Sequence, residues 1–178
     1  MGQLPPEHLT SLKKDATIES IGSLTRIEGS KLTEQQVELL LRNLEINKSS
    51  TRDEQEVAGY AQVMNTIFLH YSDIPLTENY IRQLHRDLLQ FSKKMNGIRG
   101  QYKKNTNHME AFDPGGKNLG IVFETASPFD TPFQMEKLVE WAKEAISQKI
   151  LHPSLVTSVF IVELLAIHPF LLLDVLCR

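Results

Sequence analysis

A length of 178 residues fits one domain of ordinary size, or two small ones at the limit, and can bury a core without a disulfide or metal staple. Hydrophobic residues make up 41% and charged residues 23%, which excludes a disordered chain, a collagen-like fibre and a membrane bundle. The formal net charge of −3 does not favour binding along a phosphate backbone, so we expect no nucleic-acid partner. The single cysteine, Cys177, excludes an internal disulfide.

We expect neither a signal peptide nor a membrane span in this sequence. The N-terminus lacks the basic and apolar regions of a signal peptide. The most apolar stretch, residues 155–173, is interrupted by Glu163, His168 and Pro169, whereas a membrane span needs about 20 consecutive apolar residues. We therefore expect a cytoplasmic protein without a membrane partner.

The first third of the chain is expected to be largely helical. Residues 1–15 are polar and contain proline, which predicts an arm or a short first helix, and residues 16–31 form an unusual segment. Thr33 and Gln36 then fit a capping box, in which two side chains satisfy backbone N–H groups at a helix start. A second, longer helix is predicted over residues 53–71 from its apolar stripe.

The middle of the chain changes character after one more helix. Thr77 is expected to cap a helix that continues to Leu89. Residues 92–120 are rich in lysine, asparagine and glycine, with the turn sequence Asp-Pro-Gly-Gly at 113–116. Residues 120–127 have the β-branched character of a short strand, so a loop and a hairpin are predicted here.

The same segment is basic, through Lys103, Lys104 and Lys117. Because the chain as a whole is acidic, we interpret these lysines as part of a solvated loop, and not as a nucleic-acid site.

Two helices are predicted to close the chain. Pro132 and Pro153 each suit the first turn of a helix. The second of these helices is apolar nearly all round from residue 155 to residue 167, which predicts a buried central helix. Together these patterns predict a mainly α protein with one small β element.

His168 follows this apolar helix directly. A helix C-terminus favours the protonated imidazolium, and a nearby carboxylate would hold its tautomer. By spacing alone a structural histidine in the core or at the cap is more common than a catalytic one, and both roles stay open. The other histidines are scattered, no Cys/His ligand spacing is present, and we expect no metal site.

Four features, in order over residues 16–170, resemble Fic-domain proteins. Residues 25–29, Thr-Arg-Ile-Glu-Gly, resemble the inhibitory-helix motif Ser/Thr-x-x-x-Glu-Gly/Asn, although Leu24 stands at the Ser/Thr position. The helical run from residue 54 to residue 89 resembles the early Fic helices.

The third and fourth features lie further along the chain. Gly-Gln-Tyr at 100–102, followed by Ile-Val-Phe at 121–123, resembles the approach to the family's flap hairpin. His-Pro-Phe at 168–170 resembles the start of the core motif H-x-F-x-(D/E)-G-N-G-R-x-x-R.

The resemblance implies a helical bundle around a buried central helix, with a β-hairpin flap. It also implies a protein adenylyltransferase, which moves AMP from ATP, with magnesium, to a Ser, Thr or Tyr hydroxyl of a target protein. His168 is implied as the general base, with Pro169 and Phe170 as structural residues of the motif. Glu28, with Thr25 and Gly29, is implied as the inhibitory element. The implied target-docking flap comprises Gly120, Ile121, Val122, Phe123, Glu124 and Thr125.

The resemblance also divides the chain. Residues 1–32 are predicted to form an N-terminal arm with the inhibitory-helix-like segment, and residues 33–178 a Fic-like helical domain. An apolar tail and the family habit both favour a homodimer.

The residues after Phe170 depart from the core motif. Where the motif has x, Asp/Glu, Gly, Asn, Gly and Arg, the chain has Leu171, Leu172, Leu173, Asp174, Val175 and Leu176. The motif's metal-binding carboxylate and the small residues of its phosphate-binding nest are missing, so we expect a weakly active or inactive chain. Two explanations stay open: a truncated or frame-altered piece of an active enzyme, or a degenerate Fic-like module that binds proteins without catalysis.

Overall fold

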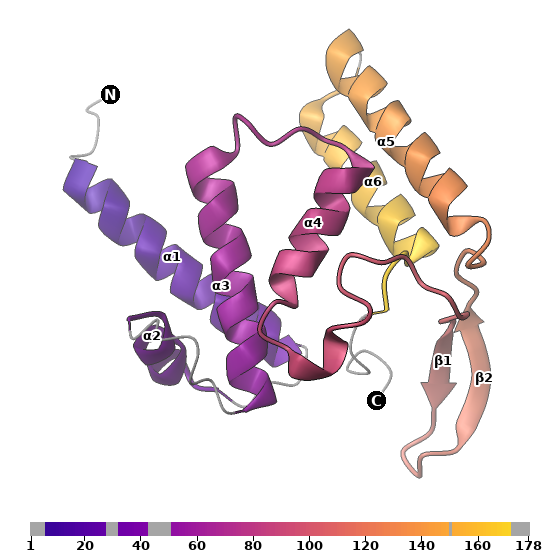
Figure 1. The fold of residues 1–178 in the computed structure, drawn as a ribbon, viewed down its shortest axis with the longest axis horizontal. Helices are drawn as coiled ribbons and strands as arrows, with labels where there is room; N and C mark the ends of the chain where they lie inside the picture. The colour runs from indigo at the N-terminus through magenta and orange to yellow at the C-terminus, as the bar shows by residue number, and fades with distance from the viewer. Residues whose placement is uncertain (1–5, 28–31, 43–50, 150, 172–178) are drawn as a thin grey trace. The chain divides into compact units, whose positions relative to one another are not determined.

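The computed structural model describes residues 6–27, 32–42, 51–149 and 151–171. They form helices and one two-stranded sheet, which confirms the predicted mainly α fold with a small hairpin (Figure 1). The elements in chain order are α1 (Pro6–Ile27), α2 (Glu34–Arg42), α3 (Arg52–His70), α4 (Glu78–Leu88), the 3-10 helix η2 (Lys93–Met95), β1 (Met109–Phe112), β2 (Asn118–Phe123), α5 (Thr131–Gln148) and α6 (Pro153–Ile167). Within these residues, no helix is long and apolar enough to cross a membrane.

The chain divides into two compact units. One comprises residues 1–74 and 84–99, and the other comprises residues 75–83 and 100–178. The domain boundary that the resemblance predicts, between residues 32 and 33, does not coincide with the division into these two units. That boundary stays a prediction.

In the first unit, α1, α2 and α3 surround a small apolar core. Its buried members are Ile21, Val37, Val57 and Ala61. The predicted capping box at the start of α2 is confirmed: the Gln36 N–H donates to Thr33 Oγ1 at 3.3 Å, and the Thr33 N–H donates to Gln36 Oε1 at 2.8 Å.

Helix α1 is longer than the predicted arm or short first helix, because it continues into the unusual segment of residues 16–31. It runs without interruption from Pro6 to Ile27. Ile21 is fully buried and Ile18 packs against the same core, so contacts with α2 and α3 hold this stretch in a helix.

Gly59 marks a close approach within the first unit. A Cβ atom at Gly59 on α3 would collide with the backbone carbonyl of Leu88 at the end of α4. Glycine is therefore required here by packing, although a glycine in a helix interior lowers helix stability by itself.

In the second unit, α5 and α6 lie side by side (Figure 1). As predicted, Pro132 lies in the first turn of α5 and Pro153 lies in the first turn of α6. The buried residues of this core are Met135, Leu138 and Ile167.

The prediction that α6 is buried all round is wrong for this structure. Only Val156 and Ile167 are buried, whereas Val162 and Leu165 are 63% and 59% exposed. The reason is that α6 packs along α5 on one side, and no other described helix or strand makes an extensive contact with it.

The hairpin is antiparallel, with Glu110 opposite Ile121 and Ala111 opposite Gly120. The predicted turn is confirmed, because Asp113 Oδ1 accepts from the N–H groups of Gly115 and Lys117 at 2.8 and 2.9 Å.

The strand itself is shorter than the predicted range of 120–127. β2 ends at Phe123. Thr125 leaves the ladder because its N–H donates to His108 Nδ1 at 3.2 Å and its hydroxyl donates to Asn107 at 3.1 Å.

Candidate active site

His168 occupies the C-cap of α6. Its backbone is left-handed, with φ 49° and ψ 61°, and its N–H donates to the Leu164 carbonyl at 2.9 Å. A residue other than glycine adopts this conformation at a cost in free energy, so surrounding contacts must hold it there. Such strain is common in residues that a protein positions for chemistry.

Those contacts come from Lys103 and Asn107. Each of the four backbone carbonyls of residues 167–170 accepts a hydrogen bond from one of them, an arrangement that we name the carbonyl clamp. The four bonds run from Lys103 Nζ to the Ile167 oxygen at 2.9 Å, from Asn107 Nδ2 to the His168 oxygen at 3.3 Å, from the Lys103 N–H to the Pro169 oxygen at 2.8 Å, and from Asn107 Nδ2 to the Phe170 oxygen at 3.3 Å.

Lys103 is only 3% exposed. Its ammonium donates to Asn107 Oδ1 at 2.8 Å, to Thr125 Oγ1 at 2.9 Å and to the Ile167 carbonyl, so all three of its protons have acceptors. All three acceptors are uncharged, and burial lowers the pKa of Lys103 to about 8.

The interpretation of Lys103 as part of a solvated loop is therefore wrong, while its neighbour Lys104 is exposed. Sequence spacing contained no signal for this role, since 64 residues separate Lys103 from its partner Ile167.

The His168 imidazole is half-buried. Burial, and then the positive charge of Lys103, lower the pKa of His168 below its ordinary value. The expectation that the helix C-terminus favours the imidazolium is therefore overturned, because desolvation and a nearby cation both oppose the charged form. Within the part of the chain that the structure describes, no hydrogen bond engages the imidazole, and the expected carboxylate partner is not among those residues.

Phe170 lies beside an aromatic and charged cluster of the second unit. Its ring centroid is 5.6 Å from that of Tyr102, and the Tyr102 hydroxyl donates to Glu78 at 2.6 Å. The Arg82 guanidinium lies 5.3 Å from the Tyr102 ring centroid, while its Nε donates to the Gly100 carbonyl at 2.8 Å. Burial, and then Glu78, raise the pKa of Tyr102, which stays neutral at physiological pH.

The predicted flap residues separate into two groups. Gly120 to Phe123 lie on β2, where every residue is exposed, including Val122 at 71%. Glu124 is also exposed, whereas Thr125 is buried and belongs to the Lys103 network. The structure thus connects the base of the hairpin to the end of α6 through Thr125 and Lys103.

The predicted inhibitory residues lie at the edge of the described part of the chain or outside it. Thr25 lies in α1, where only its backbone is described. Glu28 and Gly29 fall within residues 28–31, outside the described residues. Their role stays a prediction.

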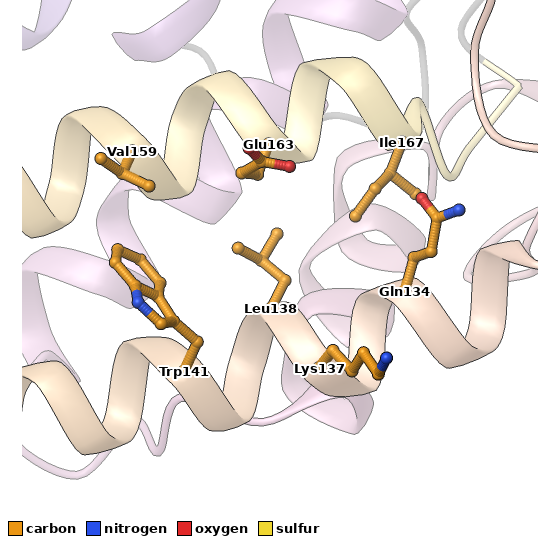
Figure 2. Close-up of a pocket in the computed structure, with 7 residues that line it drawn as sticks. All are labelled: Gln134, Lys137, Leu138, Trp141, Val159, Glu163 and Ile167. Carbon is orange, nitrogen blue, oxygen red and sulfur yellow. The ribbon is translucent and has the colours of Figure 1, made fainter.

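An open groove of about 420 Å³ runs between α5 and α6 (Figure 2). Side chains of both helices face it, with the indole of Trp141 at one end and Ile167, the residue before His168, at the other. Its lining residues are Gln134, Lys137, Leu138, Trp141, Val159, Glu163 and Ile167. No group of three His, Cys, Asp or Glu side chains that could hold a metal occurs among the described residues.

Comparison with known proteins places this arrangement in a family. The family model described as "Fic/DOC family" matches residues 75–171. The segment contains the hairpin, the carbonyl clamp and His168. A search of curated proteins found no match.

Two solved structures show the same fold. A Fic domain containing signaling protein from Bacteroides thetaiotaomicron VPI-5482 is 28% identical, with a TM-score of 0.75 over 94% of this chain. A Fic family protein from Desulfovibrio desulfuricans G20 is 21% identical, with a TM-score of 0.67, also over 94% of this chain. The matched parts cover 60% and 45% of those two chains, respectively. Because the family model matches more than half of its 178 residues, the chain belongs to the Fic/DOC family.

Proposed function

We propose that this chain is a protein adenylyltransferase of low activity, which transfers AMP from ATP to a hydroxyl side chain of a protein, with His168 as the general base. The observation that carries this proposal is the half-buried imidazole of His168 at the end of α6, whose backbone the carbonyl clamp holds. Family membership supports the reaction type.

In the proposed reaction, the hydroxyl oxygen of the target attacks the α-phosphorus of ATP. A new oxygen–phosphorus bond forms, the bond from the α-phosphorus to the oxygen that bridges to the β-phosphate breaks, and pyrophosphate leaves. The hydroxyl proton passes to the His168 imidazole. Because its pKa is lowered, His168 is unprotonated at neutral pH and can accept that proton.

The hairpin supplies a surface for the target. β2 pairs with β1 along one edge, and its apolar side chains Leu119, Ile121 and Val122 are 64%, 50% and 71% exposed. An extended peptide could add to such a strand through main-chain hydrogen bonds, which register a segment without reading its full sequence. Thr125 would then place that peptide close to His168, because it binds Lys103.

The sequence lacks the residues with which the family motif binds the nucleotide phosphates. The chain has no acidic residue at position 172 and no glycine at 173 or 175, where the family motif has a metal ligand and a nest of backbone N–H groups. The described residues include no cluster that fits magnesium, so we assign no protein ligand to that ion. Poorly held phosphates lower the rate because positioning supplies much of the catalysis of phosphoryl and nucleotidyl transfer.

Glu28 is proposed to restrain the activity further, as the resemblance of residues 25–29 to the inhibitory motif implies. Its replacement by glycine should relieve that restraint. The predicted homodimer and cytoplasmic location stay predictions.

The proposal is tested with ATP labelled at either the α- or the γ-phosphate, by following transfer to the protein itself. We expect the α-label to be incorporated and the γ-label not, with faster incorporation in Glu28→Gly. In that background His168→Ala should lower the rate by about 10²–10⁴-fold, the usual contribution of a general base. Incorporation of the γ-label would indicate phosphate transfer. Labelling that is absent, or that persists without His168, would refute the proposal.

A second candidate function is a protein-binding module without catalysis. The specific observation in its favour is the departure from the motif at positions 172–176, together with the exposed apolar strand β2. Absence of His168-dependent labelling in Glu28→Gly would favour this alternative.

A further inference from the structure

Lys103 and Lys104 are adjacent but lie in opposite environments. Lys104 is exposed, whereas Lys103 is buried and donates to three oxygens from three separate segments of the chain. Burial of an ammonium is costly, and the three hydrogen bonds of Lys103 offset part of that cost.

We infer that Lys103 and Asn107 are positioning residues, which fix the backbone of residues 167–170 through the carbonyl clamp. They thereby determine the position of the His168 imidazole. The catalytic consequence rests on the proposed function, whereas the structural part does not.

The carbonyl clamp engages consecutive peptide units without a gap. Two residues on one segment satisfy four consecutive carbonyls on another, at distances from 2.8 to 3.3 Å. Four bonds to consecutive peptide units leave the backbone little freedom to rotate. The left-handed conformation of His168, which is unfavourable in isolation, is held by the bonds on either side of it.

The place of the ammonium also matters. The Ile167 carbonyl is at the C-terminal end of α6, where the backbone dipoles leave partial negative charge. A cation is stabilised at that end of a helix. Lys103 therefore caps α6 and anchors the segment that follows it with the same side chain.

The charge of Lys103 acts on His168. It disfavours the imidazolium and adds to the effect of burial, so the imidazole stays ready to accept a proton. The other titratable groups around the turn are His108, whose Nδ1 accepts from the Thr125 N–H, and the cluster of Tyr102, Glu78 and Arg82 beside Phe170. Glu78 is bonded to Tyr102 in that cluster.

The test is an NMR titration of the His168 ring in the free protein, which needs no nucleotide. In Lys103→Met the pKa of His168 should move up towards its ordinary value. Lys103→Arg keeps the charge and should keep the pKa lowered. Lys104→Met makes the same change of charge one residue away, on the surface, and should leave the pKa of His168 unchanged. A folded Lys103→Met protein with the same His168 pKa as Lys104→Met would overturn the inference.

The wild-type protein provides a second measurement in case Lys103→Met does not fold. Since Lys103 titrates near pH 8, the chemical shift of His168 should show a second inflection near that pH. The inflection should persist in Lys104→Met and vanish in Lys103→Arg, whose guanidinium does not titrate there. A wild-type curve without a second inflection at any pH below the ordinary lysine pKa would overturn the inference.

Asn107→Ala separates position from charge. It removes the bonds to the His168 and Phe170 carbonyls and keeps Lys103, so the ring resonances of His168 should shift or broaden while its pKa stays lowered. Unchanged resonances would count against the role of Asn107.

Activity distinguishes this inference from the proposed function. In the Glu28→Gly background, Lys103→Met should lower kcat about 100-fold with little change in KM for ATP, as expected for a misplaced reacting group. If the His168 pKa responds as described and no transfer occurs, the proposed function fails and the positioning role stands. If transfer occurs and the pKa of His168 does not respond to Lys103, the positioning role fails alone.

Discussion

Lys103 Nζ lies 2.9 Å from the carbonyl oxygen of Ile167, a residue 64 positions further along the chain. This bond joins the segment before the hairpin to the last residue of α6. Through it, a loop lysine and the catalytic candidate His168 become parts of one site. The bond accounts for the burial of a lysine in a polar loop, whereas Lys104 beside it is exposed.

The titration of Lys103 should appear in the stability of the protein. Its pKa is about 8 in the folded chain and about 10.4 in an unfolded chain, so between these values the unfolded state binds more protons. The free energy of unfolding should therefore rise with pH in this window. Chemical denaturation at several pH values should show the rise in wild type and in Lys104→Met, and a smaller rise in Lys103→Met.

The rise in stability can be compared between variants only below the ordinary tyrosine pKa of about 10. The raised pKa of Tyr102 means that its hydroxyl contributes stability below the ordinary tyrosine pKa of about 10, and that this contribution is lost at higher pH. Equal slopes for Lys103→Met and Lys104→Met below that limit would contradict the prediction.

The Tyr102 hydroxyl is predicted to stabilise the second unit. Tyr102→Phe removes its 2.6 Å bond to Glu78 and keeps the ring beside Phe170. Loss of a hydrogen bond to a charged group should lower the free energy of unfolding by about 1–2 kcal/mol in urea denaturation. Tyr71→Phe, at a 75% exposed position, is the matched control and should change it by less than about 0.5 kcal/mol. Equal effects of the two changes would refute the role of this bond.

Gly59 is predicted to be intolerant of a side chain. Gly59→Ala places a Cβ against the Leu88 carbonyl, so α3 and α4 must separate. The gain in helix propensity of about 1 kcal/mol should be outweighed, for a net loss of about 1–3 kcal/mol in the free energy of unfolding. Gly97→Ala has open space around its Cβ and serves as the control. A Gly59→Ala protein as stable as wild type would show that the approach is looser than described.

The backbone of Lys149 has a strained conformation. It caps α5 with φ 54°, a left-handed conformation that glycine adopts without cost. Lys149→Gly should raise the free energy of unfolding by about 1 kcal/mol, whereas Lys149→Ala should give no such gain because it keeps the Cβ. Thermal denaturation of the two variants would show the difference, and equal melting temperatures would contradict it.

Local patterns predicted much of the fold. The capping box of Thr33 and Gln36, the helix-opening prolines Pro132 and Pro153, and the turn at Asp113 are confirmed because each depends on residues close together in sequence. Two predictions differ from the structure where distant contacts decide. α1 is longer than the predicted arm or short helix because it packs on other helices, and α6 is largely exposed because, among the described elements, only α5 makes an extensive contact with it.

The candidate site was predicted only in part. His168 could be singled out because it ends an apolar helix and begins a recognisable motif. Lys103 and Asn107 could not, since nothing in a lysine-rich and asparagine-rich loop distinguishes the side chains that fold inward from those that stay in water. Thr125 was expected on the flap, but it is buried in the Lys103 network. Its role became visible only when its partners were located.

The proposed role of His168 as the base for AMP transfer is tested most directly by the pH dependence of the reaction. The measurement is the initial rate of AMP transfer by Glu28→Gly at a series of pH values. The account predicts a rate that rises with pH through a pKa below the ordinary histidine value of 6.5, and then levels off, with His168→Ala losing most of the rate at every pH. A rate that still rises with pH above about pH 7, or one that His168→Ala retains, would contradict the assignment.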